Sequence, residues 1–408
     1  MCLEEVSLGA EQGRDYEVVV AGAGILGLAA AYHILRVDRS LKLLVVERLK
    51  GPGRGNTAKS AAAYRDMFTS PLNRQLSQGS IAFYEELQKG GFNLGLADIG
   101  YLWLLTAAQA RARRLALEGM ARAGVPLETL ERGQLSRRLP GFEAGDITLG
   151  VLGRRCGILN QGRLCSFYEQ EVGRLGGRFA YGAEVNGLMA NQGVIRGVRV
   201  GAEQITAGLV VVATGAWMGA TLALAGLSAP VVPVKRQLFS VAARDGMLAR
   251  LLHAGGFNRQ GLLPFTILPG RAYLRPAGSS FILGYADEDR VPGLEDNPAA
   301  ELDFFTSRIL PQAAQYFPAF GGTIPAYAWA GHYACHPPDN IPFVDRLAGA
   351  ILVGGDSGSG IMKGDALGRV AAGLYWGCEQ VELGDGRPFK VADLGLKDRS
   401  PSPEEFVI

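Results

Sequence analysis

A glycine-rich turn near the start of the chain constrains the fold more than any other feature. The apolar, valine-rich run 17–21 is followed by Gly22-Ala23-Gly24-Ile25-Leu26-Gly27 and then by a helix-like stretch, LAAAYHILRV. A second apolar run, at 41–47, ends in a glutamate. Strand, glycine turn, helix and strand within about thirty residues are typical of the first βαβ unit of a doubly wound parallel sheet.

The three glycines of this turn have separate expected roles. Gly22 permits the tight turn, Gly24 lets a pyrophosphate approach the backbone, and Gly27 lets the helix pack close to the sheet. The helix N-terminus adds N–H donors and a partial positive charge. At the end of the second strand, the Glu47 carboxylate can accept hydrogen bonds from ribose hydroxyls. We therefore predict a bound dinucleotide rather than a tight turn without a ligand.

Composition narrows the class of protein further. The chain has 408 residues, of which 48% are hydrophobic and 20% charged, values typical of a globular protein of two to three domains. Its net charge of +2 gives no reason to expect nucleic acid as a partner. The five cysteines form no CxxC pair, so we expect no disulfide framework and no metal site. The first residues lack the pattern of a signal peptide, which favours a cytoplasmic location, either free or peripheral to the membrane.

Residues 205–234 carry no charge and are long enough to span a membrane. However, the run 209–213 is β-branched and leads into Thr214-Gly215, followed by small residues. A buried strand, a turn and a helix explain this pattern better than a transmembrane segment, and we expect none.

The remaining periodicities predict a mixture of helices and strands. Helices are expected at 71–90 and 104–124, and a β-meander at 178–212. Alternating runs predict antiparallel strands at 231–243, 272–285 and 324–335. The run 351–355 is again a buried strand, and it leads into a glycine-rich turn that opens a helix.

The order of these pieces predicts an α/β protein with two interleaved domains. A Rossmann-like cofactor domain is expected to be discontinuous, comprising residues 14–85, 145–225 and 323–390. An antiparallel-sheet substrate domain is expected from residues 86–144 and 226–322, with 391–408 as a C-terminal tail.

Four further segments, in this order along the chain, carry a resemblance to a known family. They are NTAKSAAAYR at 56–65, ATGAW at 213–217, PVKRQ at 233–237 and GDSGSGIMK at 355–363. Together with the glycine turn, over about residues 16–375, they resemble the FAD-dependent D-amino-acid oxidase superfamily. The resemblance is to its branch of glycine oxidases, sarcosine oxidase β subunits and dye-linked L-proline dehydrogenases.

The resemblance implies FAD as the cofactor. Near His332 the family can carry a covalent flavin link through a cysteine, but here Cys335 lies three residues away, so we expect non-covalent FAD. The residues expected to hold the cofactor are Gly22, Gly24, Ile25, Leu26, Gly27, Glu47, Arg48, Lys59, Ser60, Ala61, Ala62, Val185, Thr214, Gly215, Trp217, Gly331, Gly358, Ser359, Gly360, Ile361, Met362 and Lys363.

The resemblance also implies oxidation of a small amino or imino acid, such as L-proline or sarcosine, by hydride transfer from the carbon next to the amine to flavin N5. Arg65, Tyr285, Tyr333 and Lys363 are the expected catalytic residues. Arg65 could clamp the substrate carboxylate, or it could pair with Asp66 or contact pyrophosphate. The tyrosines could line the substrate pocket or be ordinary strand residues.

The sequence 281–286 contains no Lys or His where the oxidase branch has its oxygen-activating lysine. This favours a dehydrogenase that passes electrons to a quinone, a dye or a partner subunit, although Lys235 or Lys363 could supply the charge from elsewhere. Three alternatives remain: an oxidase that produces hydrogen peroxide, the flavin-bearing subunit of a larger oligomer, and a non-catalytic FAD-binding assembly factor.

Overall fold

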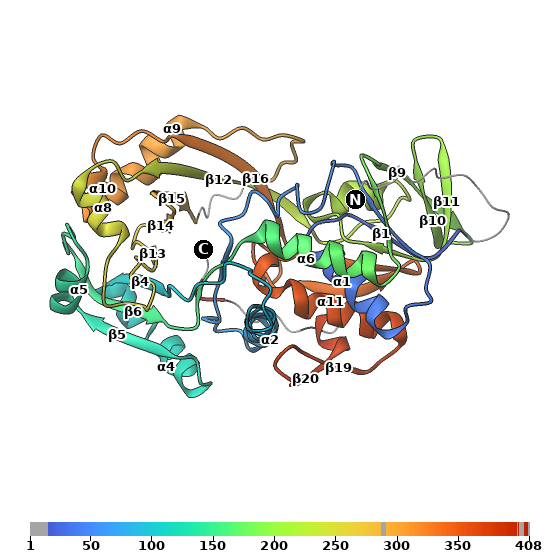
Figure 1. The fold of residues 1–408 in the computed structure, drawn as a ribbon, viewed down its shortest axis with the longest axis horizontal. Coiled ribbons are helices and arrows are strands. Elements are labelled where there is room, and N and C mark those ends of the chain that lie inside the picture. Colours follow the sequence, from blue (N-terminus) through green and yellow to red (C-terminus); the bar gives the residue numbers. More distant parts are fainter. Residues whose placement is uncertain (1–14, 287–290, 398, 400–403, 407–408) are drawn as a thin grey trace.

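Two large sheets lie toward the two ends of the molecule's long axis (Figure 1). The computed structural model describes residues 15–286, 291–397, 399 and 404–406, so Cys2, one of the five cysteines, lies outside the described residues. Each sheet has eight described strands, and helices pack around them. The expected α/β fold is confirmed.

The first sheet is the predicted doubly wound sheet. Its parallel strands follow the spatial order β8-β2-β1-β11-β18, in which the chain winds outward from β1 in both directions. These strands are β1 (Tyr16–Ala21), β2 (Leu43–Glu47), β8 (Arg178–Tyr181), β11 (Glu203–Val212) and β18 (Ala350–Gly354). The order reverses between β1 and β11, and ligands of such folds bind beyond the carboxyl ends of the strands at that point.

Antiparallel strands extend this sheet, and one detail differs from the expected meander. β9 (Val185–Asn191) and β10 (Val194–Val200) pair as hairpins that end on β11, whereas β17 (Phe343–Leu347) pairs with β18. β8 pairs in parallel with β2 and does not join the meander. It follows helix α6 (Gln161–Arg174), and a chain that returns from a covering helix adds its strand in parallel.

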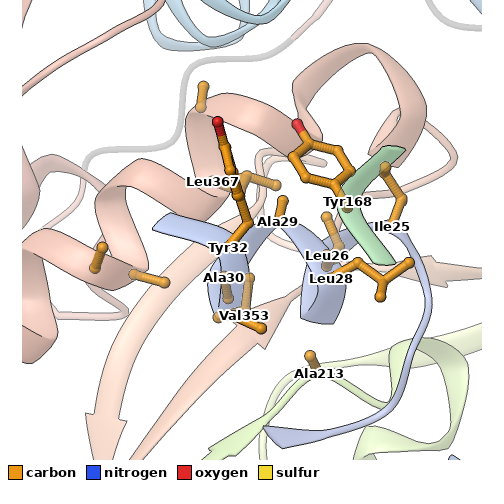
Figure 2. Packing of buried hydrophobic residues seen from close by; sticks show 14 of the residues in the cluster. Ile25, Leu26, Leu28, Ala29, Ala30, Tyr32, Tyr168, Ala213, Val353 and Leu367 are labelled. Atoms are coloured by element: carbon orange, nitrogen blue, oxygen red, sulfur yellow. The ribbon is translucent and has the colours of Figure 1, made fainter. Parts of the chain in front are cut away.

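Helices α1 (Ile25–Val37) and α11 (Gly360–Trp376) pack against each other beside the sheet, where small side chains allow a close approach (Figure 2). A Cβ on Gly368 of α11 would lie 2.6 Å from the Ala29 backbone of α1. Within this buried contact, His33 Nε2 lies 2.6 Å from the Asp365 carboxylate. The same region packs against α2 (Pro71–Lys89), whose expected span of 71–90 is confirmed within one residue.

The second sheet is mostly antiparallel and follows the order β16-β12-β15-β14-β13-β4-β6-β5. Its strands are β4 (Tyr101–Thr106), β5 (Leu127–Glu131), β6 (Ile147–Gly153), β12 (Val232–Ala242), β13 (Phe265–Ile267), β14 (Ala272–Ala277), β15 (Ser280–Tyr285) and β16 (Tyr327–Cys335).

The expected domain boundaries at 145 and 323 group β6 and β16 with the cofactor domain, whereas their hydrogen bonds join them to the second sheet. We therefore propose the same two-domain division with these two strands moved to the substrate domain.

The helix expected over 104–124 is wrong in its first part. Residues 104–106 belong to β4, where Leu105 pairs with Leu149 of β6. The Thr106 side chain and Gln109 then form a reciprocal capping box that starts the helix at residue 107. The helical part is divided into α3 (Ala107–Ala112) and α4 (Arg114–Arg122).

Shorter elements complete the described chain. The uncharged stretch 205–234 forms most of β11, then a turn and a short helix, as predicted. Among the described residues, no helix combines the length and apolar character needed to cross a membrane. The other elements are β3 (Ala63–Tyr64), β7 (Gly157–Ile158), β19 (Gln380–Glu382), β20 (Pro388–Lys390), α5 (Arg132–Arg138), α7 (Met218–Ala223), α8 (Gly246–Leu252), α9 (Leu302–Phe304), α10 (Leu310–Tyr316), η1 (Gly215–Trp217), η2 (Phe305–Ile309), η3 (Pro318–Phe320) and η4 (Val391–Leu394).

Candidate functional site

A cavity of about 600 Å³ runs from the carboxyl ends of β1 and β11 to the second sheet. It is lined at one end by the glycine turn after β1 and at the other by residues of β12, β14 and β16. Its position matches the switch point of the doubly wound sheet, where such folds bind their ligands.

Gly22, Gly24 and Gly27 of the first turn have different surroundings, so the need for glycine differs among them. Gly22 has φ +105°, and a Cβ there would lie 2.6 Å from the Ala213 carbonyl oxygen. A Cβ on Gly27 would lie 1.9 Å from the Gly22 carbonyl oxygen, so both positions are fixed by the chain's own packing. A Cβ on Gly24 would meet only Thr57 Oγ1, at an ordinary 3.4 Å. Gly24 borders the cavity, and the space beside it fits the pyrophosphate of a dinucleotide.

The carboxylate of Glu47 is held at the end of β2 by two backbone N–H groups. Ala23 N donates to Oε2 at 2.8 Å, and Leu49 N donates to Oε1 at 2.9 Å. Next to it, the Arg48 guanidinium lies 4.0 Å from the centroid of the Trp217 ring and pairs with Asp296. These contacts fix the walls of the expected ribose and adenine region.

Among the predicted cofactor residues, only Gly27 does not line the cavity, which agrees with its predicted packing role. The predicted residues that line it are Gly22, Gly24, Ile25, Leu26, Glu47, Arg48, Lys59, Ser60, Ala61, Ala62, Val185, Thr214, Gly215, Trp217, Gly331, Gly358, Ser359, Gly360, Ile361, Met362 and Lys363. We propose that they hold FAD.

The N-terminus of α11 also borders the cavity. Asp356 Oδ2 accepts a hydrogen bond from Gly360 N at 3.0 Å, so this carboxylate caps the helix. Gly358 has φ +83°, and a Cβ there would lie 2.3 Å from the Tyr333 ring. The glycine therefore lets the ring of β16 lie directly against the turn before α11.

Arg65 borders the cavity and is buried, with 5% of its surface exposed. Its NH1 and NH2 groups donate to the carbonyl oxygens of Met67 and Phe406, and the Phe68 ring covers the guanidinium at 4.1 Å. Within the described part of the chain, Arg65 donates hydrogen bonds neither to the glycine turn nor to the Asp66 carboxylate. Burial lowers the pKa of Arg65 from its usual value.

Lys363 is buried beside Arg65 and also borders the cavity. Its Nζ donates to Asn73 Oδ1 and to Ser359 Oγ, each at 2.7 Å, and it lies 4.6 Å from the centroid of the Phe68 ring. Burial, and to a smaller degree the charge of Arg65, lowers the pKa of Lys363 to about 7. Among the described residues, neither cation has a carboxylate within ion-pair distance.

The expected tyrosines separate into two groups. Tyr333 lines the cavity together with Tyr273 and Tyr101, and burial raises the pKa of all three hydroxyls. Tyr285 was expected to be catalytic, but it does not line the cavity. Its ring packs edge-on against Phe304, at 5.9 Å between centroids. The β-strand pattern did not show which face of the sheet each tyrosine occupies.

Residues 280–286, all of which the structure describes, do not line the cavity. They include the stretch 281–286, which lacks a Lys or His where the oxidase branch has its oxygen-activating lysine. Lys235 lies elsewhere and pairs with Glu301 at 2.8 Å. The absence of a cation in this stretch therefore does not distinguish a dehydrogenase from an oxidase, because Arg65 and Lys363 bring positive charge to the cavity from other elements.

Several residues that line the cavity were not predicted from the sequence. Tyr101 and Phe265 stack at 4.3 Å between ring centroids, on two neighbouring strands. Arg236 stacks over the Tyr333 ring at 5.0 Å, and Glu404 reaches the cavity from the segment after residue 403. The PVKRQ segment contained Arg236 and could have identified it, whereas no local signal distinguishes Glu404 from Glu405.

His332 borders the cavity near Trp217, with their rings 5.9 Å apart. Its Nδ1 is buried and has no hydrogen-bond partner among the described residues. Cys335, three residues further along β16, is buried but does not line the cavity.

Comparisons with known proteins agree with this architecture. FAD-dependent oxidoreductase domain-containing protein 1 of Xenopus laevis is 25% identical over 88% of this chain and 78% of its own. The glycine oxidase of Pseudomonas aeruginosa is 24% identical over 89% of this chain and 96% of its own.

Among solved structures, the L-proline dehydrogenase of P. horikoshii has a similar fold. Its TM-score is 0.76 at 22% identity, covering 89% of this chain and 93% of that chain. The family model described as FAD dependent oxidoreductase matches residues 17–374. The resemblance predicted from the motifs is confirmed: the chain belongs to the FAD dependent oxidoreductase family, and its cofactor is FAD.

Proposed function

We propose that this protein uses FAD to oxidise a small amino or imino acid, such as L-proline or sarcosine, and that it acts either as a dehydrogenase or as an oxidase. The observation that carries the proposal is the pair of buried cations, Arg65 and Lys363, which border the cavity and both lie against the Phe68 ring. A buried charge without a counter-ion is costly, and a substrate carboxylate would remove that cost.

The residues around the two cations define how a substrate would be held. Arg65 has five N–H groups, two of which bind carbonyl oxygens, so it retains donors for a carboxylate. The rings of Phe68, Tyr101 and Tyr273 border the same space and suit a small apolar body such as a pyrrolidine ring or an N-methyl group. The tyrosine hydroxyls stay protonated at neutral pH because burial raises their pKa.

FAD, when bound, supplies the acceptor for the hydride that leaves the carbon next to the amine. The contribution of the chain itself is orientation and electrostatics. The carboxylate clamp fixes one end of the substrate, and the aromatic wall excludes water from the other. No nucleophilic side chain is required for this reaction.

The test is anaerobic mixing of the purified holoprotein with a panel of amino and imino acids while the visible flavin absorption is followed. We expect L-proline or sarcosine to bleach the band, and the Arg65→Ala protein to stay yellow at the same concentration. Bound FAD that no amine bleaches would contradict the proposal and favour an assembly factor.

The oxidase is supported by Lys363, which borders the cavity, because a positive charge near the reduced flavin would stabilise superoxide as it forms. Substrate-reduced protein mixed with oxygen and with a quinone analogue in a stopped-flow instrument separates the two. A dehydrogenase reacts faster with the quinone. Comparable rates with stoichiometric hydrogen peroxide would identify an oxidase.

A further inference from the structure

Residues 404–406 form part of the wall around Arg65, which we call the substrate end. The Phe406 ring is fully buried and packs edge-on against Trp103, with centroids 4.9 Å apart. The Phe406 carbonyl oxygen accepts a hydrogen bond from Arg65 NH2. The segment is therefore anchored in the core of the second sheet, and it contacts the cation that we assign to the substrate carboxylate.

The Glu404 carboxylate borders the same cavity and is held in place by four donors. Oε1 accepts from Thr69 N and Thr69 Oγ1, both at 2.9 Å, and from Phe406 N at 3.2 Å. Oε2 accepts from Ser70 N at 3.2 Å, at the N-terminus of α2. These bonds fix the position of the carboxylate at the edge of the cavity.

Several charged side chains border this part of the cavity. Arg65 and Lys363 are two cations without ion pairs to described carboxylates, and Glu404 is a fixed anion whose charge acts on both of them. Arg236 and Asp356 also border the cavity, so these groups comprise three cations and two anions, and one further carboxylate brings them to neutrality. A second ligand carboxylate would meet the Glu404 charge, and like charges in a partly buried site repel strongly.

We propose that Glu404 is a specificity-determining residue, which admits substrates with one carboxylate and disfavours those with two. The inference rests on the proposed function, because it takes Arg65 and Lys363 as the carboxylate site. Arg236 also borders the cavity and is the residue that could accept a second carboxylate if the inference is wrong.

The experiment measures the binding of acetate and of malonate to the FAD-loaded protein by perturbation of the flavin spectrum. In the wild type we expect acetate to bind more tightly than malonate. In Glu404→Gln the ratio of the two dissociation constants should shift roughly tenfold toward malonate, since the dianion feels the lost charge twice. Glu405→Gln is the matched control. It removes the same charge from the neighbouring, exposed position and should leave the ratio unchanged.

A glutamine amide can place its NH2 against the Ser70 N–H and disturb the segment. Glu404→Ala avoids that contact, and it should shift the ratio in the same direction. Glu404→Asp keeps the charge and should keep the preference for acetate.

The failures of the two proposals are distinguishable. Acetate that binds the wild type, with a ratio that moves no more in the Glu404 variants than in Glu405→Gln, overturns the role of Glu404 and leaves the carboxylate site standing. So does a wild type that binds malonate more tightly than acetate. A wild type whose flavin spectrum responds to neither anion overturns the carboxylate site itself, and with it this inference.

Discussion

At the glycine turn after β1, which we call the cofactor end, the chain offers mainly backbone to the cavity, whereas around Arg65, the proposed substrate end, it offers side chains. The cradle around Gly22 and Gly24 is one turn between a strand and a helix, and its shape follows from positive φ and missing Cβ atoms. The substrate end takes Arg65 from the segment after β3, Lys363 from α11, Tyr273 from β14 and Glu404 from residues 404–406. The glycine turn lies within one βαβ unit, although distant residues such as Ala213 complete its surroundings, whereas the substrate end has no such local unit.

The two ends also differ in their electrostatics. N–H groups and the helix N-terminus offer partial charges to a phosphate without burying an ionised side chain. The substrate end buries two basic side chains, and burial lowers the pKa of one of them, Lys363, to about 7. Changes at the cofactor end should therefore act sterically, and changes at the substrate end should depend on charge and pH.

The largest expected effect is that of Gly24→Val. The chain itself has room for a Cβ at this position, so the fold should persist while the side chain crowds the pyrophosphate. We expect a folded but colourless protein. The ratio of flavin absorption to protein absorption should fall, and the Tm of the variant without added FAD should equal that of the wild-type apoprotein. Gly219→Val is the control, since a Cβ there has no neighbour within 4 Å. Full FAD content in Gly24→Val would mean that this turn does not border the cofactor.

The next effect is that of Arg65→Ala on substrate affinity. Loss of the charge-assisted pair should raise the dissociation constant by about 10- to 100-fold, with FAD retained. Arg65→Lys keeps the charge but loses the forked geometry, so its dissociation constant should lie between those of the wild type and of Arg65→Ala. Titration of flavin reduction with substrate gives the constants. Loss of FAD from Arg65→Ala would assign this residue to the cofactor end.

A smaller effect is the pH dependence of anion binding. Because the pKa of Lys363 is lowered to about 7, the free protein loses this charge as the pH rises through 7. Acetate prefers the protonated form, so its affinity should be highest below pH 7 and fall above it, by up to tenfold per unit. Acetate does not titrate in this range, which isolates the protein's own group. Lys363→Met should bind acetate weakly at every pH, and an equally steep profile in that variant would assign the titration to another residue.

These differences explain what could be predicted from the sequence. The glycine turn, Glu47 and Thr214-Gly215 lie within short runs whose order fixes the sheet, so their place at the cavity could be predicted, while their contacts to FAD stay a prediction. Arg65 and Lys363 were named from the family resemblance, and the structure brings them together over the Phe68 ring. Tyr285 was misassigned because a strand's alternation gives two faces without saying which faces the cavity. Glu404 was missed because its role comes from Thr69 and Ser70, more than 300 residues earlier.

The smallest expected effect concerns His332, which tests whether the cofactor end holds FAD without a covalent bond. Cys335 is buried away from the cavity, so no thiol of β16 reaches it, whereas the imidazole of His332 borders it. Burial lowers the pKa of His332, so its ring is neutral at pH 7 and contributes contact rather than charge. We expect acid precipitation to leave the yellow colour in the supernatant, and His332→Ala to change the FAD content less than about twofold, the scale of a single lost contact. A yellow pellet from the wild type that turns colourless in His332→Ala would instead show attachment through this imidazole. The cofactor end would then depend on a side chain as strongly as the substrate end does.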